Sequence, residues 1–219
     1  MCCEFDLHLH TSRHSECSVM TPEEMVGRAL EMGLDGIAIT EHEYTWSDEE
    51  IRELVKKTHA ETLIILAGQE VRCYEHWEIQ GDFLVFGTRG NFYAPTAREL
   101  IQRVHRSGGI VIAAHPYRSG LSVLGAGDMV YDLDIDALEL HHPNHPPESV
   151  KKARWAMERL KIPGIGGSDA HHADQVGCCT TRFHREVHDL FQMMDEIRRG
   201  RVRALQRNFE FRDSGFDYF

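Results

Sequence analysis

Two histidines near the N-terminus are spaced so that one metal ion could bind both. They belong to the segment Asp6-Leu7-His8-Leu9-His10, in which polar and apolar residues alternate. Because successive side chains of a β-strand point to opposite faces, Asp6, His8 and His10 are expected to share one face. Histidine is the commonest metal ligand, and Asp6 could be a further ligand or orient an imidazole. The alternative is that these residues are solvent-facing positions of an edge strand.

Further histidines and acidic residues stand where predicted apolar strands end. These ends are Thr40-Glu41-His42, Gly68-Gln69-Glu70, Ala114-His115-Pro116 and Gly167-Ser168-Asp169-Ala170-His171. In a β/α barrel the carboxyl ends of the strands lie on one face, and active sites are built there. Each segment alone is compatible with an ordinary polar loop. Their recurrence along one chain predicts a shared site.

The predicted ligands combine imidazole with carboxylate and include no thiolate. This chemistry suits Zn²⁺, Mn²⁺ or Fe and argues against Cu(I) or an iron–sulfur cluster. A carboxylate such as Glu70 could bridge two ions about 3.5–4 Å apart. We therefore predict two or three divalent transition metal ions. The six cysteines form no Cys-x-x-Cys pair, and we interpret them as reduced thiols of a cytoplasmic protein.

Short apolar segments alternate with amphipathic ones along the 219 residues. The predicted strands cover residues 5–10, 36–40, 62–71, 83–86, 110–114, 137–140 and 164–168. The predicted helices run from the N-cap Thr21 to about Gly33 and over residues 47–57, 96–107, 148–160 and 187–199. This alternation predicts a single-domain α/β fold of the β/α-barrel type, with a parallel sheet and right-handed crossovers. Residues 119–134 contain three glycines and could form a flap, whereas residues 208–219 could be an edge strand, a contact surface or a frayed end.

The charge balance limits the partners. The net charge is −11, and the basic residues form no evident cluster, although Arg198, Arg199, Arg201 and Arg203 lie near the end of a predicted helix. Binding of a long nucleic acid depends on many Lys and Arg contacts with phosphates, so we expect no such partner. No apolar run is long enough to span a bilayer, and the N-terminus lacks the pattern of a signal peptide. A G-x-G-x-x-G motif and a complete G-x-S-x-G motif are also missing, which disfavours dinucleotide binding and serine hydrolysis.

Taken as an ordered set, the motifs resemble those of the PHP family, named after polymerase and histidinol phosphatase. The resemblance extends from Asp6-Leu7-His8-Leu9-His10-Thr11 to Gly200-Arg201-Val202 and thus covers nearly the whole chain. It implies one domain over residues 1–219, folded as a distorted seven-stranded, TIM-barrel-like β/α barrel. It also implies a cluster of up to three metal ions that hydrolyses phosphate esters.

The same resemblance implies roles for individual residues. The first metal would be held by His8, His10, Glu70 and Asp169, with Glu70 bridging to a second metal that His115 also holds. His42 and His171 would hold the third. Further candidate ligands, less firmly placed by the motifs, are Asp6, His14, Glu16, Glu41, His76 and Asp82. Among these, Asp82 or His76 would replace a histidine that many family members have, and His14 and Glu16 compete for one position after the first motif.

We predict that a metal-bound hydroxide attacks phosphorus in a small phosphate ester, either a phosphomonoester or a short nucleotide. Asp169 and His171 would act at the reacting centre, and Arg118 would clamp the phosphate with its planar fork, Arg13 being a second candidate. The histidine-rich segment Leu140-His141-His142-Pro143-Asn144-His145 is interpreted as polar surface rather than as part of the site. Two alternatives remain open: an amidohydrolase-like enzyme that cleaves a C–N bond, and a catalytically silent metal-binding regulatory module. The substrate, the native metal and the oligomeric state are not determined by the sequence.

Overall fold

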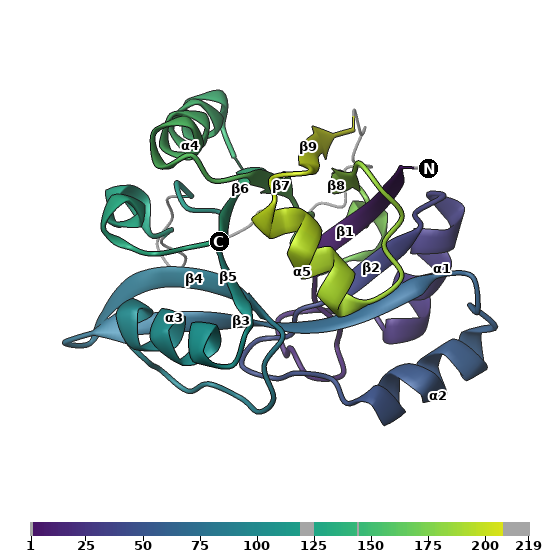
Figure 1. Cartoon of the computed structure of the whole chain (residues 1–219). Coiled ribbons are helices and arrows are strands. Elements are labelled where there is room, and N and C mark those ends of the chain that lie inside the picture. The colour runs from purple at the N-terminus through teal and green to yellow at the C-terminus, as the bar shows by residue number, and fades with distance from the viewer. Residues whose placement is uncertain (1, 119–124, 144, 208–219) are drawn as a thin grey trace.

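A single curved sheet forms the centre of the molecule, with helices packed on its outside (Figure 1). The computed structural model describes residues 2–118, 125–143 and 145–207. Its strands are β1 (Cys3–Leu9), β2 (Gly36–Ile39), β3 (Ile64–Glu75), β4 (Glu78–Phe86), β5 (Ile110–Ala113), β6 (Ala137–His141), β7 (Gly164–Gly166), β8 (Cys179–Phe183) and β9 (Val202–Gln206). Their order in the sheet is β7-β6-β5-β4-β3-β2-β1-β8-β9.

The two ends of this strand order curl toward each other. The backbone N–H of Gly166 in β7 donates to Oγ1 of Thr181 in β8 at 3.0 Å, and the same hydroxyl donates to the carbonyl of Gly166 at 2.9 Å. These bonds join β7 to the far side of the sheet. The result is a nearly closed barrel.

Nine strands replace the seven that were expected from the family resemblance. All seven predicted segments form strands, but β8 and β9 were not predicted. Both are antiparallel additions: β8 pairs with β1, and β9 pairs with β8. The run Cys179-Thr180-Thr181-Arg182-Phe183 combines β-branched and aromatic residues, which is the composition typical of a strand.

The expectation of a parallel sheet was also wrong for part of the barrel. β3 continues for 12 residues and turns back into β4, so β4 is antiparallel to both of its neighbours. The turn between them places His76 and Trp77 at positive φ, 50° and 71°. A two-residue connection of this kind joins antiparallel strands, whereas parallel strands need a longer crossover.

The five predicted helices are confirmed, with small differences at their ends. They are α1 (Pro22–Glu31), α2 (Asp48–Thr58), α3 (Ala97–Arg106), α4 (Pro147–Leu160) and α5 (Leu190–Arg198), and short 3-10 turns form η1 (Gly127–Asp132) and η2 (Ala173–Gln175). Capping boxes start the first three helices, at Thr21, Ser47 and Thr96. Each supplies hydrogen bonds to backbone N–H groups that the first helical turn cannot satisfy. Residues 119–124 of the expected flap and the whole segment 208–219 lie outside the described residues.

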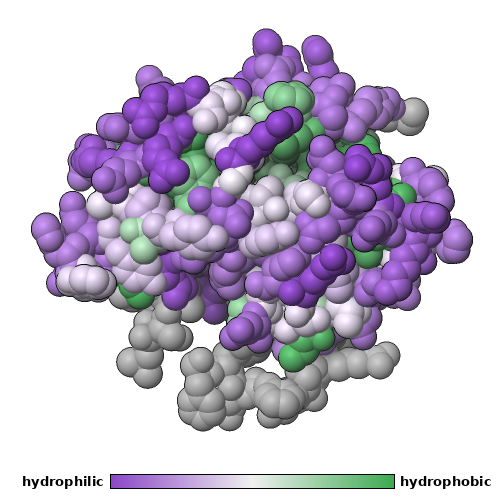
Figure 2. Space-filling model, turned by 90° about the horizontal axis from the view of Figure 1, so that it is seen from below, coloured by the Kyte–Doolittle hydropathy of each residue, from purple (hydrophilic) through white to green (hydrophobic). Residues whose placement is uncertain are grey.

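Apolar side chains fill the barrel wall on both sides of the strands. Phe5 of β1 and Phe183 of β8 meet edge to face with ring centroids 5.3 Å apart. The surface is mainly hydrophilic on the face that Figure 2 shows, with hydrophobic residues between the polar ones. No helix in the described part of the chain is long and apolar enough to cross a membrane.

A candidate metal centre at the ends of the strands

Four buried side chains from different segments bring their polar atoms to one point inside the barrel mouth. They are His8, His10, Glu70 and Asp169. Nε2 of His8 lies 3.0 Å from Nε2 of His10, and Oδ1 of Asp169 lies 3.3 Å and 3.2 Å from these two nitrogens. Oε2 of Glu70 lies 3.5 Å and 3.3 Å from the same pair. Ligands held about 2.1 Å from one ion are separated from each other by about 3.0–3.4 Å, so the four atoms fit a single cation. We call these four residues the inner group.

Strand pairing places these residues together. The end of β1 continues into a bridge between Leu9 and Ala170, and the backbone N–H of His10 donates to the carbonyl of Ala170 at 3.1 Å. On the other side, a bridge joins His42 to Glu70. The carboxyl ends of neighbouring strands therefore converge, as expected for a barrel.

Hydrogen bonds behind the two imidazoles determine which nitrogen faces the ion. Nδ1 of His8 donates to Oε1 of Glu139 at 2.9 Å. Ser15 donates its hydroxyl hydrogen to Glu41 at 2.6 Å, so its oxygen is left to accept from Nδ1 of His10 at 3.4 Å. In both rings Nε2 is then the nitrogen that is left to bind an ion. Buried carboxylates behind metal-binding histidines have this orienting role in many proteins.

Glu70 and Asp169 each face two sets of nitrogen atoms. Oε2 of Glu70 faces Nε2 of His8 and of His10, whereas its Oε1 lies 3.1 Å from Nε2 of His115. Oδ1 of Asp169 faces Nε2 of His8 and of His10, whereas its Oδ2 lies 3.1 Å from Nε2 of His142. Two further sets of potential ligands result, His115 with His142 and Asp169, and Glu70 with Asp82 and His115. Carboxylates placed in this way can bridge neighbouring ions.

His142 corrects the interpretation of residues 140–145 as polar surface. Its side chain is fully buried, and His145, also buried, stacks near it with ring centroids 5.1 Å apart. Burial lowers the pKa of His145 to about 4, so its ring is neutral near pH 7. His141 is only partly buried. These histidines could not be told apart from the sequence, because the strand register shifts between Glu139 and His141.

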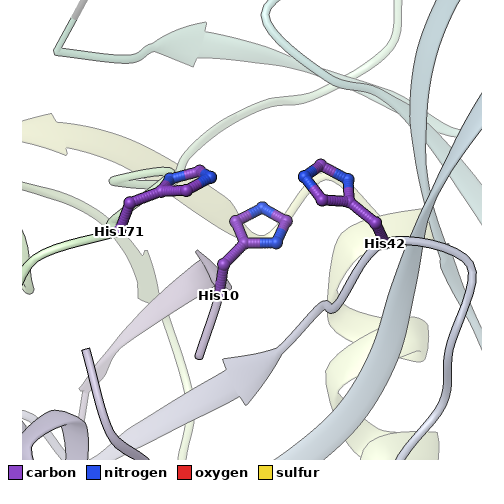
Figure 3. A group of neighbouring side chains, drawn as sticks. All are labelled: His10, His42 and His171. Carbon is purple, nitrogen blue, oxygen red and sulfur yellow. The ribbon is translucent and has the colours of Figure 1, made fainter. Parts of the chain in front are cut away.

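A fourth set consists of three imidazoles at the rim, where His10, His42 and His171 turn toward one another (Figure 3). The rings of His10 and His42 have centroids 4.4 Å apart, and those of His10 and His171 are 4.6 Å apart. Interactions with His42 and His171 lower the pKa of the Cys17 thiol to about 6, although burial alone would raise it, so Cys17 lies beside this set. No cysteine belongs to a set of potential ligands among the described residues, but Cys17 lies beside this one. We call His10, His42, His171 and Cys17 the rim group.

The field inside the site favours positive charge. Burial alone would raise the pKa of Glu70, but His8 and hydrogen bonds from neighbouring histidines hold it well below its ordinary value. The pKa of Asp169 is lowered in the same way, again against the effect of burial. Burial would lower the pKa of His8, but Glu139, Asp169 and Glu70 raise it well above its usual range. Closely spaced buried carboxylates require a compensating cation, and divalent metal ions fit this donor set.

The backbone adopts unusual conformations at two of these residues. Asp169 and His115 have positive φ values of 50° and 28°. Non-glycine residues in such conformations concentrate at functional sites, where surrounding contacts hold them. Next to Asp169, a Cβ on Gly167 would lie 2.5 Å from Oε1 of Glu139 and 2.6 Å from Cβ of His8. Only glycine at this position leaves the hydrogen bond between Glu139 and His8 intact.

Several candidate ligands belong to none of these four sets. Asp6 accepts hydrogen bonds from the backbone N–H groups of Ser168 at 3.0 Å and Gly177 at 2.8 Å, and so ties β1 to the segments that follow β7. Glu41 accepts from Thr11, Ser15 and Trp46 and fixes the loop after β1.

His14, Glu16 and His76 are also absent from every set that could hold an ion among the described residues. His14 pairs with Glu50 at 3.0 Å and stacks on Tyr44, while His76 is exposed in the turn between β3 and β4. Asp82 does lie beside His115, although Arg72 donates to both of its carboxylate oxygens at 2.7 Å and 2.9 Å.

The two arginines considered for phosphate binding also differ. Nη1 of Arg118 lies 3.0 Å from Oδ2 of Asp169, and its side chain keeps 22% of its surface exposed. Arg13 pairs with Glu50 at 3.4 Å and lies over the ring of Trp46. Of the two arginines, Arg118 contacts a residue of the inner group, whereas Arg13 contacts Glu50 and Trp46 outside it.

Comparison with known proteins gives a family assignment. Residues 6–139 match the PHP domain, and residues 147–202 match a PHP-associated region. An uncharacterized protein of Methanocaldococcus jannaschii is 31% identical over 152 residues, which are 64% of this chain and 82% of that protein.

Solved structures share the fold at low sequence identity. A two-domain protein of Bacteroides vulgatus, described as containing a predicted PHP-like metal-dependent phosphoesterase, superposes with a TM-score of 0.67 at 15% identity. The match covers 94% of this chain and 65% of that one. The lesion-specific endonuclease Q of Pyrococcus furiosus superposes with a TM-score of 0.64 at 18% identity, over 93% of this chain and 58% of that one. This chain thus spans less than two thirds of both proteins.

Proposed function

This chain belongs to the PHP domain family of metal-dependent phosphoesterases, and from that premise we propose that it hydrolyses small phosphate esters at a centre of two or three divalent metal ions. The proposal rests on one observation above all. Nε2 of His8 and Nε2 of His10 lie 3.0 Å apart, and one carboxylate oxygen each of Glu70 and Asp169 lies within 3.5 Å of both nitrogens.

Three ion positions follow from the residues present. His8, His10, Glu70 and Asp169 would hold the first, and Glu70, Asp169, His115 and His142 would contribute to the second, with Asp82 beside them. His10, His42 and His171 would hold the third, with Cys17 at its edge. A thiolate donor favours zinc or iron over manganese at that position.

Divalent ions in such a centre supply a hydrolytic water of lowered pKa and neutralise charge on the phosphoryl oxygens. The protein contributes the orientation of its imidazoles, through Glu139 and Ser15, and a guanidinium at the mouth. Arg118 would leave its contact with Asp169 in part and bind a phosphoryl oxygen, for which its planar fork is suited. Nδ1 of His171 bonds to the backbone carbonyl of Asp169 at 2.8 Å, so its Nε2 would be the nitrogen that holds the third ion.

A small substrate is favoured by the charge of the chain. The net charge is −11, and a long polyanion needs many cationic contacts along a track, whereas Arg118 is the arginine at the centre. The endonuclease Q relative was solved with duplex DNA, so the test must include nucleic acids. We propose a phosphomonoester or a short nucleotide as the substrate.

The experiment combines metal analysis with a substrate panel. Purified protein is reconstituted with Mn²⁺, Zn²⁺ or Fe²⁺, and the bound metal is counted by elemental analysis. Phosphomonoesters, short phosphodiesters, long single strands, abasic-site duplexes and amide substrates are then compared at low and physiological salt. We expect two or three ions per chain and activity on small esters that changes little with salt. Efficient, strongly salt-sensitive cleavage of long DNA alone, or C–N hydrolysis alone, would contradict the proposal.

A further inference from the structure

A second cavity lies on the outside of the barrel, between α4, α5 and β9. Its volume is about 540 Å³, within the range of sites that bind small molecules, about 300–1,000 Å³. The residues with basic side chains that line it are Arg154, Lys161, Arg198, Arg199 and Arg203. We call it the basic cavity.

The charge of the residues that line the basic cavity is opposite in sign to the net charge of the chain. The chain has 35 acidic and 24 basic residues, yet none of the residues that line the cavity is an Asp or Glu. The sequence could not indicate this cluster, because Arg154 and Lys161 come from α4 and meet α5 and β9 only in the folded barrel. The expectation that the basic residues form no cluster was therefore wrong, because the fold brings five of them to one cavity.

Neighbouring residues satisfy only part of this positive charge. Arg199 pairs with Asp195 at 2.7 Å, and Arg198 donates to the carbonyls of Gly108 and Gly109 at 2.8 Å and 2.9 Å. For Arg154, Lys161 and Arg203, no ion pair is formed with any residue in the described ranges 2–118, 125–143 and 145–207. All three are exposed. Their cationic groups therefore have no acidic partner within the described part of the chain.

The floor of the basic cavity is apolar. Leu140, Met157, Ile162 and Val202 contribute to it. A ligand that contacts both the basic and the apolar residues of the cavity has a compact group of negative charges and an uncharged part. Arginine forks bind phosphate oxygens in pairs, and linked phosphates offer several such oxygens within the span of one cavity.

We propose that the basic cavity is a second anion-binding site, separate from the metal centre, that takes a small molecule with two or more linked phosphate groups. Its location supports the separation from the metal centre. Leu140 contributes to the cavity floor, whereas the neighbouring Glu139 bonds to His8 inside the barrel. The two sites therefore lie on opposite faces of β6.

The test measures binding of inorganic tripolyphosphate, of ATP and of citrate to the full-length, metal-loaded protein by calorimetry at low salt. The cavity variant is Arg154→Ala with Arg203→Ala. The matched control, Arg52→Ala with Arg98→Ala, removes two exposed arginines from α2 and α3 and so changes the net charge equally. A third variant, Asp169→Asn, removes the other place where phosphates could bind.

We expect the cavity variant to weaken tripolyphosphate and ATP binding by at least about tenfold, since each charged hydrogen bond contributes more than one factor of ten. The control should bind as the wild type does, whereas Asp169→Asn should lose only binding at the metal centre and keep the binding that depends on the basic cavity. Arg154→Lys with Arg203→Lys, which keeps the charge but loses the forks, should be intermediate and excludes misfolding as the cause. Equal loss in the control, loss only in Asp169→Asn, tighter binding of citrate, or cavity-dependent binding of a long single strand without tripolyphosphate binding would each overturn the proposal.

Discussion

The inner group and the rim group share His10 but are built differently. The side chains of His8 and His10 are 0% exposed, and those of Glu70 and Asp169 are 3% and 6% exposed. At the rim, the side chains of His42 and His171 are 40% and 22% exposed. Buried hydrogen bonds orient the inner imidazoles, whereas no carboxylate outside the ligand set orients His42 or His171 among the bonds of the described residues. We therefore expect the inner group to hold an ion more firmly than the rim group does.

The largest effect is expected from Asp169→Asn, which removes a ligand that faces two ion positions. Loss of a group that merely orients a ligand lowers metal affinity or activity by about 10–100-fold, so loss of the shared ligand should exceed a hundredfold. Metal content and phosphoesterase turnover measure it. A variant that keeps all ions would show that the inner group is not the main binding set.

Glu139→Gln should have the next largest effect, although Glu139 is not itself in any ligand set. The amide can still face Nδ1 of His8 but no longer carries the charge that stabilises the ring. We expect metal affinity to fall by about 10–100-fold, measured by competition with a fluorescent chelator. Unchanged affinity would mean that the hydrogen bond has no role in the preorganisation.

His142→Ala should lower the metal content by one ion, because Nε2 of His142 faces the same carboxylate oxygen of Asp169 that Arg118 contacts. His141→Ala, one position earlier and outside every ligand set, is the matched control and should keep all ions. Elemental analysis of both variants decides whether the second position depends on this buried residue.

His42→Ala should remove only the rim ion. During dialysis against a weak chelator, the wild type should lose one ion before the others, and the variant should lack that early phase. The expected activity loss is smaller than for Asp169→Asn. Simultaneous loss of all ions from the wild type would contradict the expectation that the inner group holds its ion more firmly than the rim group.

Cys17→Ser should have the smallest effect on turnover and a specific effect on metal choice. With Co²⁺ bound, a thiolate ligand gives a near-ultraviolet charge-transfer band, which should be present in the wild type and absent in the variant. Relative affinity should shift from zinc toward manganese because the soft donor is lost. If the band is absent from the wild type, Cys17 does not contact the ion.

The sequence predicted the strand ends and most of the residues that meet there, because each strand end combines an apolar run with an abrupt polar residue. It did not predict β8 and β9, which depend on pairing with β1 across the whole chain. Glu139 was missed although it is a lone carboxylate within the apolar run 137–140, a pattern that could have identified it. His142 and Cys17 could not be found in this way. Their positions follow from a register shift in β6 and from a loop path, neither of which leaves a periodic signal.

The central position of β1 determines when the protein can acquire metal during synthesis. Asp169 leaves the ribosome 161 residues after its partner His8, and β8, which covers the other edge of β1, is made after that. Contacts so distant in sequence form slowly, and a nascent chain has no complete inner group until Asp169 has been released. Metal uptake is therefore expected to report completion of the barrel, because binding to a set that exists only in the folded chain is coupled to folding.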